Sequence, residues 1–170
     1  MISSAMRTMR RVMMMVGIGR LLADTNETPS TPTVQVALAA GEIRGDVPLM
    51  QQYGLASRPV PGSDAIVIFV GGDRTRGIAI ATGDQRGRPT DLQPGEVCLY
   101  HPQTGSRIWL KEDGSIALVP ANNKVTTPGD FTAGGTITGN EVQAQGIKLS
   151  THPHNGVQPG SGNSGAPVAS

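Results

Sequence analysis

Aromatic residues are scarce in this sequence, which has one tryptophan, two tyrosines and two phenylalanines among 170 residues. Because aromatic rings usually supply much of the buried area of a core, this scarcity excludes a large globular interior filled with rings. The single cysteine, Cys98, excludes an intrachain disulfide, so packing, a metal or oligomerisation has to stabilise the chain. Glycine and proline are abundant instead, with 23 and 13 copies. The chain is therefore either partly disordered or buries small branched side chains in another way.

Excess charge and long apolar runs are also missing. The formal net charge is +1 and the sequence pI is about 8.0. A chain this close to neutrality lacks the high net charge that favours disorder throughout, and it lacks the basic balance of a dedicated nucleic-acid binder. Uninterrupted apolar runs such as residues 12–16 and 65–70 are far shorter than the roughly 20 residues that span a bilayer. We therefore expect no transmembrane helix, and no secretory signal in the N-terminal stretch.

Residues 1–32 are expected to form a short amphipathic helix and a linker. The first 20 residues contain four arginines and no acidic residue. Met6, Met9 and Met13 recur at helical spacing, with two of the arginines on another side. Two interpretations stay open: the helix docks on a membrane surface or a partner, or it packs on its own domain or is frayed. Turn-forming residues then make a linker of residues 24–32.

Residues 33–110 have the pattern of a small all-β barrel followed by a connecting hairpin. Short apolar or alternating runs are separated by turn signals, and Asp113-Gly114 is a strong hairpin turn. Phe69 lies inside one of the apolar runs and is expected in the core. The expected strands cover residues 34–38, 65–70, 77–81, 96–100, 107–110 and 115–119.

Residues 111–170 are expected to form a trimeric β-helix. From Gly114 onward the sequence holds four charged residues and one aromatic, and glycines divide it into short β-like phrases that begin at residues 129, 134, 139 and 146. Each phrase is too short to bury its own apolar face, so burial has to come from stacking on neighbours or on copies of the chain. Three chains wound about one axis would supply three aliphatic side chains per layer. A disordered tail is the alternative.

His152 and His154 are the candidate metal ligands. The two histidines stand at positions i and i+2 of an extended segment and so share a face, with Pro153 between them favouring extended backbone. One chain offers two imidazoles, too few to hold a metal tightly, whereas three chains would offer six. Zinc structural sites prefer four ligands, so six imidazoles suit an octahedral first-row metal such as iron. Without the solenoid context, a solvated loop would be favoured.

The stretches GDFTAGGTITG and GIKLSTHPHNGVQPGSGNSGAPV resemble the C-terminal tip of the central membrane-piercing spike of contractile-tail bacteriophages, the Mu-like baseplate assembly protein V family. The resemblance covers nearly the whole chain and is strongest in the last ~40 residues. It implies an all-β fold with a short N-terminal helix, an OB-fold-like barrel and an intertwined trimeric triple-stranded β-helix. It also implies a structural, non-enzymatic virion protein.

The family resemblance further implies partners and cofactors. The homotrimer would sit at the tail baseplate tip, contact the baseplate hub protein through its N-terminal half, and meet the host outer membrane with its C-terminal tip. It would be made in the host cytoplasm and bind no nucleic acid. One iron ion per trimer would be held by His152 and His154 from each of three chains. Calcium and chloride on the axis are also possible in this family.

Three other functions are disfavoured. The segment around Ser164 resembles the nucleophile region of trypsin-like serine proteases, but the chain that would build a specificity pocket is missing and the first histidine, His101, lies in a turn sequence. A cell-wall hydrolase would need two paired carboxylates on a cleft, and the 13 acidic residues are scattered. An OB-fold binding module with a disordered glycine-rich tail is the remaining alternative, although stacking aromatics in a basic groove are few.

Overall fold

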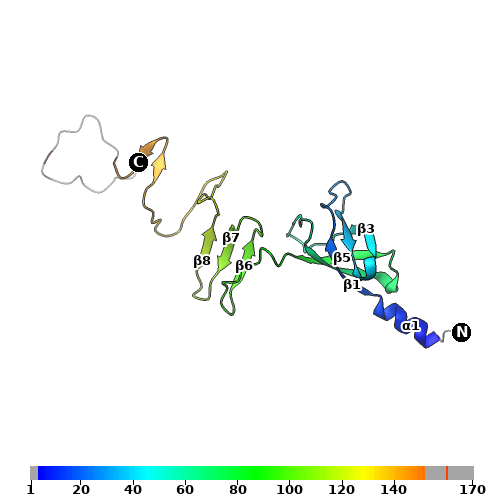
Figure 1. Cartoon of the computed structure of the whole chain (residues 1–170). Helices are drawn as coiled ribbons and strands as arrows, with labels where there is room; N and C mark the ends of the chain where they lie inside the picture. Colours follow the sequence, from blue (N-terminus) through cyan, green and yellow to red (C-terminus); the bar gives the residue numbers. More distant parts are fainter. Residues whose placement is uncertain (1–3, 152–159, 161–170) are drawn as a thin grey trace. The chain divides into compact units, whose positions relative to one another are not determined.

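The computed structural model describes residues 4–151 and residue 160, and it divides into two compact units, Met1–Val125 and Thr126–Ser170. Apart from one α-helix and two short 3₁₀ turns, every regular element is a β-strand, so the expected all-β class is confirmed (Figure 1). None of the helices in the described residues has the length and apolar character needed to cross a membrane. The elements are α1 (Ser4–Met13), β1 (Val16–Leu21), β2 (Thr33–Ala37), η1 (Ala39–Gly41), β3 (Ile43–Pro48), β4 (Asp64–Phe69), η2 (Val70–Gly72), β5 (Gly77–Gly83), β6 (Val97–Tyr100), β7 (Arg107–Leu110), β8 (Ile116–Val119), β9 (Gln143–Ala144) and β10 (Ile147–Lys148).

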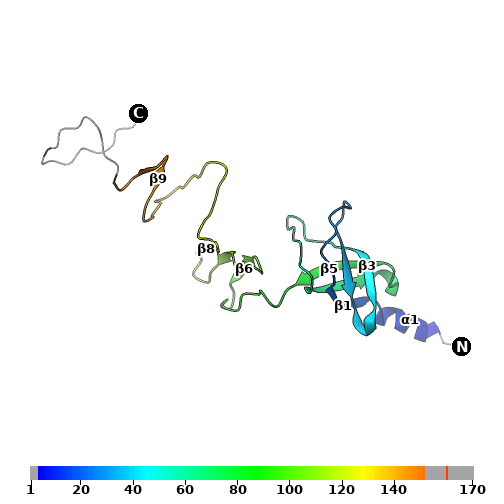
Figure 2. The same cartoon turned by 45° about the horizontal axis from the view of Figure 1, so that its top comes forward.

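The first five strands form one curled antiparallel sheet in the order β3-β2-β1-β4-β5. Its two edges approach each other, because Leu49 and Ala79 form a parallel bridge and the Met50 N–H donates to the Ala79 carbonyl at 2.8 Å. The curl is visible in both views (Figure 1, Figure 2). Alternate side chains of these strands therefore meet inside the curl and form the core of the first unit.

The core of this sheet is built almost entirely from aliphatic side chains. Phe69 is its one aromatic member and is fully buried, as expected from its apolar run. Small branched residues fill a narrow curled sheet without large rings, which accounts for the low aromatic content of the sequence. The core comprises Leu21, Val34, Val36, Leu38, Val47, Leu49, Ala65, Val67, Phe69 and Ala79.

Strand β1 lies in the middle of the sheet, in the range expected to be helix and linker. Its inward positions are occupied by Gly17, Gly19 and Leu21, while larger residues point outward. A Cβ on Gly19 would lie 2.3 Å from the Ala37 carbonyl oxygen, so only glycine fits there. The apolar alternation that normally marks a strand is therefore reversed, and this is why the sequence pattern did not indicate β1.

Helix α1 is present as expected and ends at Met13. The chain turns directly into β1, and the Phe69 N–H donates to the Met15 carbonyl at 2.7 Å. The helix packs at its C-terminal end against η2, where a Cβ on Gly72 would meet the Arg11 carbonyl oxygen. None of its residues is buried, and it projects from the sheet in both views (Figure 1, Figure 2).

The second unit contains the β9–β10 hairpin. Gln145 and Gly146 both have positive φ angles, of 50° and 83°, as a two-residue type I′ turn requires. The hairpin coincides with the last two expected glycine-punctuated phrases, and all of residues 121–151 are exposed in the single chain. The expected domain boundaries after residues 32 and 110, and the trimeric β-helix, stay predictions.

Candidate functional site

The expected metal ligands His152 and His154 lie outside the described residues, as does Ser164. Within the described part of the chain, no group of three or more His, Cys, Asp or Glu residues could hold a metal ion. The structure does describe the hairpin that leads to the histidines, up to Thr151. Two features of the described residues bear on the candidate site: this hairpin and the β6–β8 sheet.

Glu141 closes the hairpin that precedes the histidine pair. Its carboxylate accepts hydrogen bonds from the backbone N–H of Val142 at 3.0 Å and of Ser150 at 3.2 Å, and from the Ser150 hydroxyl. The Ser150 hydroxyl, followed by the Ser150 N–H, holds the pKa of Glu141 below its usual range. The Leu149 N–H also donates to the Val142 carbonyl at 2.8 Å. These hydrogen bonds fix the hairpin as far as Ser150, two residues before His152.

Strands β6, β7 and β8 form a separate three-stranded antiparallel sheet with one wholly aliphatic face. The register pairs Val97 with Leu110 and Leu99 with Ile108, and β8 continues both rows. All six side chains on this face are between 42% and 66% exposed. We call them the aliphatic face: Val97, Leu99, Ile108, Leu110, Ile116 and Leu118. The residue alternation of these strands is present in the sequence, but the register of the three strands decides which side chains share the uncovered face.

The opposite face of this sheet carries Arg107 and Trp109, which are bonded to other residues of the chain. The Trp109 indole N–H donates to Glu96 Oε2 at 2.9 Å, and the Arg107 guanidinium lies 4.1 Å from the indole ring centroid. Arg107 also donates twice to the Asp91 carboxylate, each time at 2.8 Å. The backbone N–H of Gln93, with weaker contributions from other donors, holds the pKa of Glu96 below its usual range. Side chains on this face therefore have bonded partners within the chain, whereas those of the aliphatic face stay between 42% and 66% exposed among the described residues.

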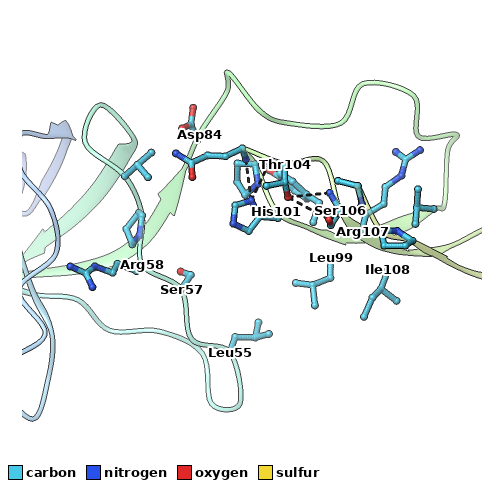
Figure 3. A pocket seen from close by; sticks show the side chains of 18 of the residues that line it. Leu55, Ser57, Arg58, Asp84, Leu99, His101, Thr104, Ser106, Arg107 and Ile108 are labelled. Carbon is cyan, nitrogen blue, oxygen red and sulfur yellow. Dashed lines mark hydrogen bonds between the residues drawn. The ribbon is translucent and has the colours of Figure 1, made fainter. Parts of the chain in front are cut away.

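A cavity of about 1170 Å³ adjoins the aliphatic face. Leu99 and Ile108 project side by side at this cavity, while Leu55 and Arg58 belong to the segment across from them (Figure 3). The wall near His101 is a hydrogen-bonded turn, in which His101 Nδ1 accepts from the backbone N–H of Gln103 and Thr104 at 3.3 and 3.2 Å. His101 is thus the turn residue that the sequence indicated.

Comparisons with known proteins match both ends of the chain. Residues 21–86 match the family described as Bacteriophage Mu Gp45, N-terminal, and residues 146–168 match the GpV Apex motif, which includes both histidines. The baseplate puncturing device gp45 of Escherichia phage Mu is 39% identical over 107 residues, which is 62% of this chain and 53% of that protein. The Mu-like prophage FluMu protein gp45 of Haemophilus influenzae is 36% identical over 93 residues, 55% of this chain and 50% of that protein. The chain spans about half the length of the curated relatives it matches.

The matches and the fold agree with one another. The Gp45 match covers β2 to β5 of the curled sheet, and the apex match begins in the turn of the β9–β10 hairpin. The family resemblance inferred from the sequence is confirmed by independent matches on these two separate regions. The chain is thus similar in two separate regions to the Mu-like phage baseplate spike proteins, and these relatives indicate a place at the tip of the tail baseplate of the virion.

Proposed function

We propose that the chain is one subunit of a homotrimeric spike that pierces the host outer membrane mechanically when the phage tail contracts. The observation that carries this proposal is the aliphatic face of β6–β8. Fully burying one aliphatic side chain contributes about 1.5–3 kcal/mol, so six of them on one sheet favour association strongly. Three copies about one axis would cover one another's aliphatic faces, as two layers of a domain do.

The second unit supports the same proposal. Ile147 and Leu149 of the β9–β10 hairpin are 60% and 64% exposed, and Phe131 and Ile137 are exposed to a similar extent. A single copy of this segment has no core of its own, whereas a triple-stranded β-helix would bury these side chains between chains. The low charge of residues 114–170 suits such a shaft, since like charges from three chains would not meet at its axis.

At the apex we propose one iron ion bound by His152 and His154 of three chains. The match to the apex motif covers both residues. The hydrogen bonds between Ser150 and the Glu141 carboxylate fix the hairpin that precedes them. A bound metal would tie three chain ends together at the point where strands otherwise fray. Its role in this proposal is structural, and no catalysis is involved.

The N-terminal unit would form the collar of the spike. We propose that its curled sheet is an OB-fold-like barrel, which the strand order and the Leu49–Ala79 bridge support. Its partner would be the baseplate hub protein. The relatives' printed description as a puncturing device supports the proposed mechanical role.

Sedimentation at micromolar concentration tests the trimer directly, and we expect a single species of three chains. The variant Leu118→Asp places a charge on the aliphatic face and is expected to give monomers. Ile43→Asp is the matched control, because Ile43 and Leu118 are equally exposed at 55% but Ile43 lies on β3. A monomeric wild-type protein would refute the trimeric architecture.

A further inference from the structure

The loop of residues 51–57, here called the Tyr53 loop, is held rigidly by its own side chains. The Gln51 side-chain amide donates to the Ser57 carbonyl at 2.5 Å and accepts from the Ser57 N–H at 2.6 Å. The Leu55 N–H donates to the Gln52 carbonyl at 3.0 Å within the loop. The side-chain amide of Gln51 thus pairs with both backbone groups of Ser57, in the way that the backbone of a neighbouring strand does. Such bracing lowers the entropy that the loop would lose on binding a partner.

The base of the loop is tied to a distant part of the chain. Arg58 Nε and Nη2 donate to the two carboxylate oxygens of Asp24, at 3.0 and 2.5 Å. This bidentate geometry fixes orientation as well as distance. The Tyr53 loop is therefore anchored to the segment that precedes β2.

The tip of the loop presents apolar side chains that its own chain leaves uncovered. Tyr53 is fully exposed, and Met50 and Leu55 are each 53% exposed. Residues 47–62 contain no acidic residue, and their one basic residue, Arg58, is already paired. A braced, uncharged loop with a tyrosine at its tip has the character of an interface anchor, because tyrosine is enriched among the residues that dominate binding energy.

A cavity of about 540 Å³ lies beside the Tyr53 loop, and Tyr53 itself does not line it. Its apolar lining includes Leu49, Leu55 and Ala56, and its polar lining includes Glu27, Ser30 and Thr31. A tyrosine suits such a site, because it combines an apolar ring with a hydroxyl that needs a hydrogen-bond partner. The same chain thus carries a protruding tyrosine and, beside it, a cavity with both apolar and polar lining residues.

We propose that Tyr53 of one copy enters this cavity on the next copy, forming a contact between neighbouring collar domains of the spike. This inference rests on the proposed homotrimer. Because Tyr53 does not line the cavity of its own copy, each contact joins the tyrosine of one copy to the cavity of the next, and a threefold rotation closes these contacts into a ring in which every tyrosine is buried. The loop's lack of unpaired charge allows copies to approach without repulsion, which favours a second copy of this chain as the occupant.

The test replaces Tyr53 in the full-length chain with the photoreactive residue p-benzoylphenylalanine. Irradiation is expected to give covalent dimers and trimers on denaturing electrophoresis, with cross-links to residues 27–32 or 55–58 by mass spectrometry. The same photoreactive residue at Ile43, which is also exposed, is the matched control and is expected to give no cross-links to those residues. The variant Thr31→Trp, which fills the cavity, is expected to reduce the Tyr53 cross-link at least tenfold.

Sedimentation of the same samples separates this inference from the proposed function. A trimer in which position 53 gives no cross-links between copies, or gives them only outside residues 27–32 and 55–58, overturns the Tyr53 contact and leaves the homotrimer standing. A Thr31→Trp variant that cross-links as the parent does also overturns the contact. A wild-type monomer overturns the homotrimer and the Tyr53 contact together.

Discussion

Arg74 Nη2 lies 2.7 Å from Glu42 Oε2, and this ion pair joins the two loops that flank the start of β1. The Arg74 guanidinium also lies 3.8 Å from the centroid of the Phe69 ring, and Nη1 donates to the Met14 carbonyl at 3.4 Å. Arg44 Nε adds a second contact to Glu42 at 2.6 Å. One carboxylate thus binds two arginines, and one of them, Arg74, lies over the aromatic ring of the core beside the junction of α1 and β1.

The ion pairs of Glu42 with Arg74 and Arg44 predict that the folded protein loses stability in acid. The hydrogen bond from Arg74, followed by that from Arg44, lowers the pKa of Glu42 from 4.5 to about 2. Because the folded-state pKa lies below the unfolded value, the stabilisation is fully present above about pH 5 and is lost as the pH falls toward 2. Glu42→Gln should therefore lower the free energy of unfolding by about 1–2 kcal/mol at neutral pH, less than the pKa shift alone implies because solvent screens the pair.

Denaturant unfolding of both proteins across this pH range measures the effect. The difference between wild type and Glu42→Gln should shrink steadily as the pH falls from about 6 to about 2.5. The exposed Glu27→Gln variant is a suitable control, expected to change stability little. A wild-type minus Glu42→Gln difference that stays constant over that range would contradict the prediction.

Gly19→Ala should destabilise the curled sheet. A Cβ at residue 19 would lie 2.3 Å from the Ala37 carbonyl oxygen and 2.8 Å from Val36, both of them close-packed, so the strands would have to separate. We expect a loss of about 1–3 kcal/mol or more in thermal or denaturant unfolding. Gly45→Ala, in β3, is the matched control because nothing lies within 4 Å of its Cβ position. Equal stability of the two variants would show that the sheet accommodates the methyl group.

Trp109 is the only tryptophan and reports on the β6–β8 sheet. Glu96→Ala removes the acceptor of the indole N–H and of the Glu112 N–H, so the fluorescence of Trp109 should shift toward longer wavelength as water reaches the indole. Glu112→Ala is the control, because it keeps the backbone N–H of residue 112 and leaves Glu96 as the acceptor of the indole N–H. We expect its fluorescence spectrum to match that of wild type. Identical spectra for Glu96→Ala and wild type would mean that the indole N–H does not depend on Glu96.

Removing both histidines should release the metal without dissociating the trimer. His152→Ala with His154→Ala is expected to abolish bound iron in elemental analysis while sedimentation still gives three chains, because the aliphatic face lies elsewhere in the chain. His101→Ala is the control and should retain the metal, since His101 belongs to the β6–β7 turn. Wild-type protein without any transition metal would remove the proposed iron site.

The strands that the sequence predicted share one property, an apolar run or alternation with side chains directed into the core. Val34 and Val36 of β2 and the run ending at Phe69 in β4 follow that pattern, and each lies within one or two residues of its expected position. Both hairpins of the β6–β8 sheet were likewise indicated, because their turns and alternation are local signals.

Strands β1 and β3 were missed for a physical reason. In β1 two of the three inward positions are glycines, and at Gly19 close packing with neighbouring backbone replaces side-chain burial. In β3 only Val47 is buried, and Asp46 has a positive φ of 54°, so the strand lacks a regular alternation. The proposed spike interface was also beyond sequence reasoning at residue level, because which face of β6–β8 stays uncovered depends on the register of three strands.

The bridge between Leu49 and Ala79 has a consequence for how many copies can assemble. Sheets with free edges invite further strands and grow into fibres, but this bridge brings the two edges of the curled sheet together and withdraws Met50 and Ala79 from pairing with another chain. Growth of this sheet by strand addition is thereby disfavoured at the bridged position, where side chains and not backbone groups are left for contacts between copies.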